Sequence, residues 1–265
     1  MGEGALLPLT TENYYSREAD RAYMSVSQYF NFLSCEAREV ARLRGEWSPE
    51  PTDALLVGQY VHTAFEGPEA QREFIGSHPE MFTQKGTLKA QFQQGQAMIQ
   101  AVRNDPFALF MLEGEHEVIL TAEMFGTPWK IRVDVLNHEY HRQVDLKTAR
   151  SFDRVWDEHN RRWESFVGHY RYMARMGIYD QVLNLATGEN WKAFIVAVTK
   201  ESPPDKMIIN MWDPVQYAID LASVEVNMPR ILAVKAGEVE PWRCERCEYC
   251  RGTKRLERVI HYTEL

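Results

Sequence analysis

Two short segments decide the fold: WKIRVD at residues 129–134 and VDLK at residues 144–147. Their composition predicts two strands of an antiparallel hairpin that folds midway between Glu139 and Tyr140. This register places Asp134 directly opposite Asp145. Because side chains alternate between the two faces of a strand, Lys147 shares the face of both aspartates. The other face is aliphatic and predicts a core contact: Ile131, Val133, Val135, Val144 and Leu146.

The opposed aspartates indicate a metal site. Residues directly opposite on an antiparallel pair have Cβ atoms about 4.5–5.5 Å apart. Two carboxylates that close repel each other unless a cation lies between them, and oxygen ligands suit Mg²⁺ or Mn²⁺. Lys147 would point at the same place and could position a water or hold a phosphate oxygen. An ordinary sheet with one solvent-facing side has the same alternation, so the hairpin alone leaves both interpretations open.

A helical histidine adds a third candidate ligand. Gly58, His62 and Glu66 follow one another at a spacing of four residues, which places them on one stripe of a helix. Gly58 would allow another backbone to approach closely. A single histidine on a helix can be structural, but beside the hairpin we interpret His62 as a metal ligand. Glu66 and Glu117 are weaker candidates.

The rest of the chain predicts an α/β fold with a central mixed β-sheet flanked by helices on both sides. Helices are expected from Ser25 or Ser27 to Arg44 and over residues 52–66, 88–104, 163–185 and 214–235. Strands are expected over residues 115–125, 128–136, 143–149, 193–199 and 207–212. We expect residues 1–240 to form one domain. Residues 241–265 are then a cysteine-rich segment that docks on the N-terminal helix through Cys35.

The cysteines indicate a second metal site. Cys244, Cys247 and Cys250 form a Cys-x₂-Cys-x₂-Cys run, and Cys35 is the remaining cysteine of the chain. This run is typical of sites that hold iron–sulfur cubanes and take a fourth thiolate from elsewhere. A structural zinc site more often uses two separated Cys-x-x-Cys pairs. We therefore predict a [4Fe–4S] cluster of structural role, with zinc as the alternative and unligated thiols as a third interpretation.

Composition sets broader limits. The chain has 265 residues, 45% hydrophobic and 26% charged, which predicts a packed globular core. No apolar run approaches the ~18 residues of a membrane-spanning helix. Residues 1–10 lack the pattern of a secretory signal, so a cytoplasmic location is expected. The net charge of −8 argues mildly against binding of nucleic acid through the phosphate backbone alone. It does not exclude a nuclease, because metal-binding carboxylates add negative charge.

The ordered set Gly58-x-x-x-His62, Asp134 and Asp145-x-Lys147 resembles the RecB-type subgroup of PD-(D/E)XK nucleases. The flanking sequence resembles more narrowly the RecE-like recombination exonucleases of phages. Four segments carry this second resemblance: residues 23–27 (YMSVS), 145–148 (DLKT), 197–200 (AVTK) and the closing Cys-x-x-Cys-x-Tyr-Cys motif. The resemblance extends over residues 10–260.

The resemblance implies a Mg²⁺-dependent exodeoxyribonuclease. Its site would comprise His62, Asp134, Asp145, Lys147 and a helical tyrosine, Tyr179. The substrate would be a linear double-stranded DNA end, resected 5′ to 3′ for a single-strand annealing protein, and the enzyme could be a homo-oligomer. Many relatives carry Gln-x-x-x-Tyr where this chain has Arg175-Met-Gly-Ile-Tyr179. The role of Arg175 is therefore open between phosphate contact and an ordinary solvated helix position.

Two other functions are compatible with the sequence. One is a nuclease that acts on single-stranded ends within a helicase–nuclease or CRISPR-adaptation system. The other is a catalytically silent nuclease fold that serves as an iron–sulfur or zinc DNA-binding module. The presence of Asp134, Asp145 and Lys147 argues against the silent module.

Overall fold

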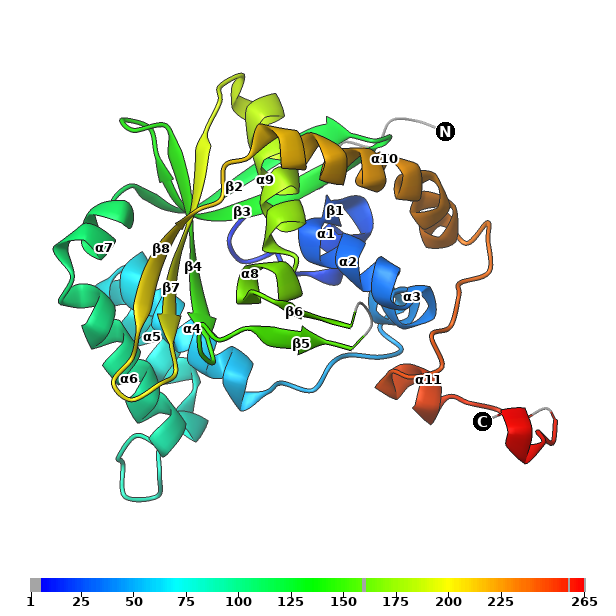
Figure 1. The fold of residues 1–265 in the computed structure, drawn as a ribbon, viewed down its shortest axis with the longest axis horizontal. Coiled ribbons are helices and arrows are strands. Elements are labelled where there is room, and N and C mark those ends of the chain that lie inside the picture. The colour runs from blue at the N-terminus through cyan, green and yellow to red at the C-terminus, as the bar shows by residue number, and fades with distance from the viewer. Residues whose placement is uncertain (1–5, 159–160, 257, 265) are drawn as a thin grey trace. The chain divides into compact units, whose positions relative to one another are not determined.

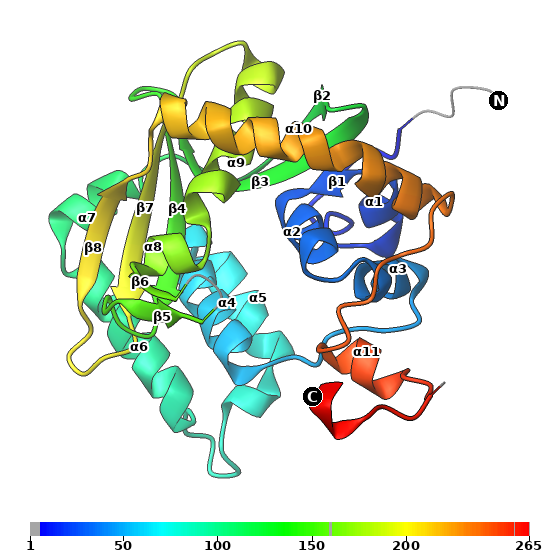
Figure 2. The ribbon, with the colours of Figure 1, turned by 45° about the vertical axis from the view of Figure 1, so that its right-hand side comes forward.

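A computed structural model describes residues 6–158, 161–256 and 258–264 of the chain (Figures 1 and 2). These residues form two compact units. One unit comprises residues 50–124 and 128–224, and we call it the sheet unit. The other comprises residues 1–49, 125–127 and 225–265, and we call it the terminal unit because it contains both ends of the chain.

The sheet unit contains a mixed sheet. Strand β3 pairs with β4 antiparallel, β4 with β7 parallel and β7 with β8 antiparallel, and β2 also pairs with β3. The strands are β2 (Glu115–Met124), β3 (Thr127–Asn137), β4 (Arg142–Ala149), β7 (Lys192–Thr199) and β8 (Lys206–Asn210). The prediction of a central mixed sheet is confirmed.

Helices cover both faces of this sheet (Figure 1). One face packs aliphatic residues such as Val144 and Leu146 against four helices. These helices are α4 (Asp53–Glu66), α5 (Pro68–Ser77), α6 (Ala90–Arg103) and α7 (Pro106–Met111), with the short η1 (Pro79–Met81) after α5. The other face packs Ala149 and Ile195 against α8 (Phe166–His169), α9 (Tyr172–Thr187) and the first part of α10 (Pro214–Ala236). The flanking helices of the predicted fold are confirmed.

The expected helix over residues 163–185 is wrong in its first part. Residues 162–164 form strand β6 (Arg162–Glu164), which pairs with β5 (Val155–Asp157) in a separate hairpin. Ser165 then caps the short helix α8, and Arg171 adopts a left-handed conformation with φ 54° before α9 begins. The aromatic residues of this stretch recur at a helical spacing, but the left-handed residue and the strand pairing interrupt the helix.

The terminal unit is built mainly of helices. Its elements are α1 (Arg17–Ala22), β1 (Met24–Ser25), α2 (Val26–Ser34), α3 (Glu36–Arg44), the second part of α10, α11 (Glu248–Gly252) and η2 (Tyr262–Glu264). The single helix expected up to Arg44 is wrong, because Cys35 has extended backbone angles and separates α2 from α3. No glycine or proline signals this break in the sequence.

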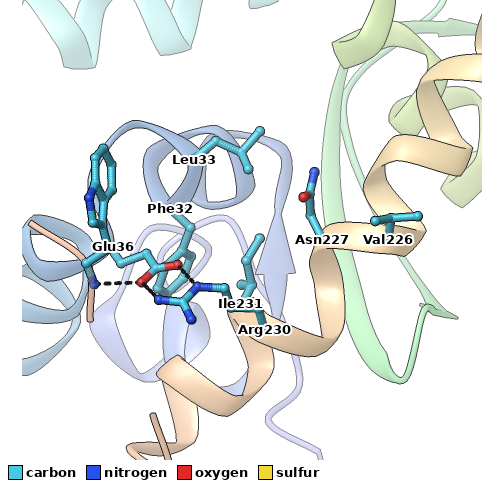
Figure 3. Close-up of a pocket in the computed structure, with 8 residues that line it drawn as sticks. Phe32, Leu33, Glu36, Val226, Asn227, Arg230 and Ile231 are labelled. Atoms are coloured by element: carbon cyan, nitrogen blue, oxygen red, sulfur yellow. Dashed lines mark hydrogen bonds and ion pairs between the residues drawn. The ribbon is translucent and has the colours of Figure 1, made fainter. Parts of the chain in front are cut away.

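Glu36 joins three segments of the terminal unit (Figure 3). Its carboxylate accepts hydrogen bonds from Arg230 Nε at 2.7 Å and Nη2 at 2.8 Å, and from the Trp242 backbone N–H at 2.7 Å. The Ala37 N–H donates to the Trp242 carbonyl at 3.0 Å. A bidentate arginine–carboxylate pair is geometrically specific. These bonds therefore hold the start of α3 beside α10 and beside the segment that leads into the C-terminal cysteines.

None of the helices in the described ranges is long and apolar enough to cross a membrane.

Candidate active site

The β3–β4 hairpin has the register that the sequence predicts. The paired positions run from Asn137 and Arg142 to Val135 and Val144, and Asp134 and Asp145 are the next residues on the two strands. At that step the Leu146 backbone N–H donates to Asp134 Oδ2 at 2.9 Å, so a side chain replaces the backbone ladder. Asp134 and Asp145 are half-buried, whereas the aliphatic residues of the opposite face are buried. The predicted alternation of the two faces is confirmed.

Lys147 lies on the same face and contacts Asp145. Its Nζ donates to Asp145 Oδ1 at 2.6 Å. Burial alone would lower the pKa of Lys147, but the carboxylates of Asp145 and Asp134 outweigh burial and raise it above the usual lysine value. Burial also raises the pKa of Asp145, and the neighbouring Asp134 carboxylate adds to this shift. Lys147 is therefore a cation that opposes part of the negative charge of the hairpin.

Helix α4 brings His62 to the hairpin. Thr52 caps this helix by accepting from the Leu55 N–H, and its buried residues, Val57 among them, join the core beneath β4. His62 Nδ1 lies 3.5 Å from Asp134 Oδ2. The expectation that Gly58 admits another backbone is wrong, since a Cβ there would meet only the Thr148 hydroxyl at 3.6 Å, an ordinary contact.

Glu117 on β2 extends the acidic cluster. Burial raises its pKa to about 8, and the negative charges of Asp134 and Glu66 contribute to the shift. Its carboxylate is paired with Arg132 of β3. The Glu117 backbone is left-handed, with φ 59°, a conformation that non-glycine residues rarely adopt within a strand. Strained positions of this kind gather at functional sites. The pKa of Glu117 thus depends on both Asp134 and Glu66, which connects the two weaker candidates to the hairpin electrostatically.

The donor set suits a hard divalent cation. His62 contacts Asp134, and the Asp134 carboxylate acts on the pKa of both Asp145 and Glu117. Lys147 and Arg132 are the neighbouring cations in the contacts described above. Oxygen donors of this kind are the usual ligands of Mg²⁺ and Mn²⁺. The carboxylates are at present held by other partners, Asp145 by Lys147 and Asp134 by the Leu146 N–H. A bound cation would therefore compete with these hydrogen bonds.

Helix α9 contributes Tyr172 and Arg175 to the surroundings of the centre. The charge of Lys147 acts on the pKa of Tyr172, although burial is the larger influence and raises it. Burial lowers the pKa of Arg175, and Tyr172, Tyr179 and Asp145 act in the opposite direction with smaller effect. Arg175 also donates from Nε to the Tyr170 carbonyl at 3.1 Å. It is therefore a partly buried residue of the site region and not an ordinary solvated helix position.

Tyr172 is a residue that the sequence interpretation missed. Tyr172, Arg175 and Tyr179 follow one another at i, i+3 and i+7, the spacing of one helical stripe. Because the helix was expected to begin near residue 163, the stripe had no defined start. Helix α9 in fact begins at Tyr172, one helical turn before Arg175. The charge of Lys147 acts on the pKa of this tyrosine.

The four cysteines of the terminal unit lie together. Their Sγ atoms are all within 4.8 Å of one another, and Cys35 Sγ lies 3.5 Å from Cys250 Sγ. Burial raises the pKa of Cys35, and it raises that of Cys250 to about 12. Burial acts in the same direction on Cys244, but hydrogen bonds from backbone amides outweigh it and lower its pKa to about 6. The cluster thus combines one thiol of lowered pKa, Cys244, with two of raised pKa, Cys35 and Cys250.

The cysteine set, unlike the carboxylate centre, is already arranged closely enough to bind a metal ion. Among the described residues, it is the one group of three or more His, Cys, Asp or Glu side chains already close enough to hold an ion. Thiolates at this closeness suit a metal of the zinc or iron type. The chain therefore has one preformed sulfur site and one oxygen-rich centre whose carboxylates accept hydrogen bonds from Lys147 and the Leu146 N–H.

Comparison with known proteins relates this chain to a nuclease-like fold. Residues 25–253 match the family described as a PDDEXK-like domain of unknown function, DUF3799. A crystal structure of a "Putative exonuclease" from Eubacterium rectale superposes with a TM-score of 0.91 at 39% identity, covering 97% of this chain and 98% of that one. A further structure, SSO0001, gives a TM-score of 0.28 at 15% identity over 74% of this chain and 92% of that one. The comparison with curated proteins gave no match.

The family match spans the segments that form the carboxylate hairpin, helix α4 and the cysteine cluster. The chain has a mixed sheet with flanking helices, and one hairpin of that sheet carries Asp134, Asp145 and Lys147. On this evidence the chain belongs to the DUF3799 family of PDDEXK-like domains.

Proposed function

We propose that the protein is a metal-dependent DNA exonuclease. The observation that carries the proposal is the convergence of Asp134, Asp145 and Lys147 on one face of the β3–β4 hairpin, with His62 beside Asp134. The exonuclease description of the similar Eubacterium rectale structure supports the same reaction class. Hydrolysis of a phosphodiester bond needs a positioned water and stabilisation of negative charge, and these residue types can supply both.

Asp134, Asp145 and His62 would hold one or two Mg²⁺ or Mn²⁺ ions, with Glu117 and Glu66 as further oxygen donors. When bound, such an ion lowers the pKa of a coordinated water and offsets charge that develops on the phosphate. Lys147 would turn from Asp145 to orient the attacking water or hold a phosphate oxygen. Arg175 and Tyr179 would contribute a cation and a hydroxyl at the edge of the centre, where a scissile phosphate could contact them.

The finer assignment rests on resemblance. We infer that the substrate is a linear double-stranded DNA end, that degradation runs 5′ to 3′, and that the product strand passes to an annealing protein in phage-type recombination. A cytoplasmic location and a homo-oligomeric state belong to the same proposal.

The decisive experiment compares linear with circular DNA in the presence of Mg²⁺. An exonuclease digests linear duplex and leaves covalently closed circles intact, and strands labelled at one end report polarity by the order in which label is released. Digestion of closed circles would indicate an endonuclease instead. Absence of hydrolysis with either Mg²⁺ or Mn²⁺ would contradict the proposed function.

Metal binding at the hairpin gives a separate prediction. Titration calorimetry should detect Mn²⁺ binding to the wild-type protein. Replacing Asp145 by alanine should weaken that binding by about tenfold or more, because an oxygen ligand is lost. The matched control is Glu139→Ala, an exposed carboxylate at the turn of the same hairpin. Equal affinities of the wild type and Asp145→Ala would show that the ion binds elsewhere.

For the cysteine cluster, we propose a structural metal site that joins α3 to the C-terminal segment and so fixes residues 241–265 on Cys35. Two occupants fit four thiolates, a [4Fe–4S] cluster and zinc. The Cys-x₂-Cys-x₂-Cys spacing favours a [4Fe–4S] cluster. The closeness of the sulfurs favours zinc, since Zn–S bonds of ~2.3 Å place tetrahedral sulfurs roughly 3.8 Å apart. A cubane binds each thiolate through a different iron and so requires the sulfurs to spread.

A further inference from the structure

The β5–β6 hairpin exposes two tryptophans. Trp156 and Trp163 lie directly opposite each other on the two strands, and their rings are 5.6 Å apart at an interplanar angle of 64°. Their exposed fractions are 39% and 61%. Exposed aromatic pairs are uncommon on a surface that has no partner, because their burial would be favourable. The hairpin therefore presents an apolar surface of the kind that binds a ligand.

The segment that contains the pair is basic in an otherwise acidic chain. Residues 150–175 contain six arginines against four acidic residues, whereas the whole chain has a net charge of −8. Arg154, Arg161 and Arg171 are exposed, and Arg162 is paired with Glu164 at 2.6 Å. A locally positive surface that carries exposed aromatic rings is complementary to a polyanion with flat bases.

Packing connects this hairpin to the candidate active site. Strand β5 follows the end of β4, which carries Asp145 and Lys147, and β6 leads back to α8 and α9 (Figure 1). Phe152, just before β5, packs against Phe166 of α8 at 5.4 Å, and Phe166 packs against Tyr172 at 6.1 Å. Phe152 and Tyr172 pack against the same hydrophobic cluster as Ala149 of β4, two residues after Lys147. Both ends of the hairpin are thus anchored next to the centre.

A third exposed ring, Tyr170, follows the hairpin in the chain, between α8 and α9. Tyr170 is 50% exposed, and its ring lies 5.6 Å from that of Tyr172 and 4.9 Å from that of His169. Trp156, Trp163 and Tyr170 thus expose aromatic faces within the segment that leads from β4 to α9. Bases of a single strand can stack on faces of this kind.

We propose that Trp156 and Trp163 stack on unpaired bases of the DNA strand that is delivered to the Asp134–Asp145 centre, while the neighbouring arginines contact its phosphates. The proposal rests on the proposed nuclease function and names the form of its substrate. In a duplex the faces of the bases are covered by their neighbours, so only unpaired nucleotides offer a face to a tryptophan. The structure thus favours a substrate strand that is single-stranded on the approach to the centre, even where the end began as a duplex.

The test measures binding of two labelled probes by fluorescence anisotropy: a single-stranded oligothymidine and a blunt-ended duplex. It uses the full chain with Asp145→Ala, so that neither probe is cut. Adding Trp156→Ala and Trp163→Ala together should weaken binding of the single strand by about tenfold or more, because the stacking contacts between the bases and both rings are lost. Duplex binding should change much less.

Two further variants serve as controls. Trp212→Ala removes a tryptophan of similar exposure, 42%, that lies outside the hairpin, and it should leave both affinities unchanged. Trp156→Phe with Trp163→Phe retains aromatic faces and should recover most of the single-strand affinity. Unchanged single-strand binding by the double alanine variant, with an unchanged melting temperature, would overturn the proposal. Cleavage assays with the wild-type protein distinguish the two proposals. Binding that depends on the tryptophans but is not accompanied by hydrolysis would contradict the nuclease function and support the stacking surface.

Discussion

Replacing Lys147 by alanine is expected to reduce the rate of DNA cleavage by about 10²–10⁴-fold, the usual loss when a group that acts on the attacking water is removed. DNA affinity should stay close to that of the wild type, because Lys147 is one cation of a larger surface. Its Nζ lies 2.6 Å from Asp145 and shares the face of Asp134, so it is placed at the reacting centre and not at its rim. Single-turnover digestion of an end-labelled duplex measures the rate, and anisotropy measures the affinity.

Lys192→Ala is the matched control for this change. Lys192 is an exposed lysine on β7, the strand that pairs parallel with β4, so its replacement removes the same charge from the same sheet. Cleavage by this variant should equal that of the wild type. If Lys147→Ala keeps more than about a tenth of the wild-type rate, Lys147 has no direct part in the chemistry. A loss of both cleavage and binding would instead indicate a role in holding DNA.

Replacing Cys35 by serine is expected to remove the bound metal and lower the melting temperature by roughly 10 °C, since loss of a structural metal is among the few single changes with large effects on stability. Cys35 is fully buried and 3.5 Å from Cys250, and it is the one cysteine of the cluster from outside the C-terminal run. Metal analysis after anaerobic purification, together with thermal unfolding, measures both effects.

The neighbouring variant Ser34→Ala is the control, because Ser34 is exposed and bonds only locally, to the Phe30 carbonyl, in the contacts described. It should keep the metal and the stability of the wild type. A wild-type metal content in Cys35→Ser would exclude Cys35 as a ligand. In either case the Mn²⁺ affinity of the hairpin should not change in protein that remains folded, because the two sites use separate residues.

The same metal analysis identifies the occupant of the cysteine cluster. About four irons with matching sulfide and a brown colour would establish a [4Fe–4S] cluster. One zinc without iron would establish the tetrahedral site that the close sulfurs suit. Absence of both would leave the cysteines as thiols packed at the junction of α3 and the C-terminal segment.

The sequence determined those features that depend on strictly local periodicity. Alternation of polar and aliphatic residues in residues 129–147 predicted which face of the hairpin is buried, and the fold point midway between Glu139 and Tyr140 predicted the register that Val135 and Val144 adopt. This works because strand side chains have a period of two, so a slip of one residue would expose the whole aliphatic face. The mixed sheet and its flanking helices follow from the same patterns.

Only the tertiary structure decided where helices stop for reasons other than their own sequence. The helix expected up to Arg44 breaks at Cys35, where Glu36 gains Arg230 and the Trp242 N–H as partners. Likewise, Trp163 joins a strand because Trp156 lies opposite it. Short aromatic stretches fit a helix or a strand about equally well, and the pairing partner settles which one forms.

Some residues of the candidate active site could be predicted from the sequence, and others could be recognised only in the tertiary structure. Asp134, Asp145 and Lys147 could be grouped from the sequence because one hairpin carries all three. Glu117 and Tyr172 gained their significance only in the fold, since their neighbours come from other strands and helices and their electrostatic influence depends on burial. Spacing along a chain describes neighbours within one element, whereas distance and burial between elements arise only when the core packs.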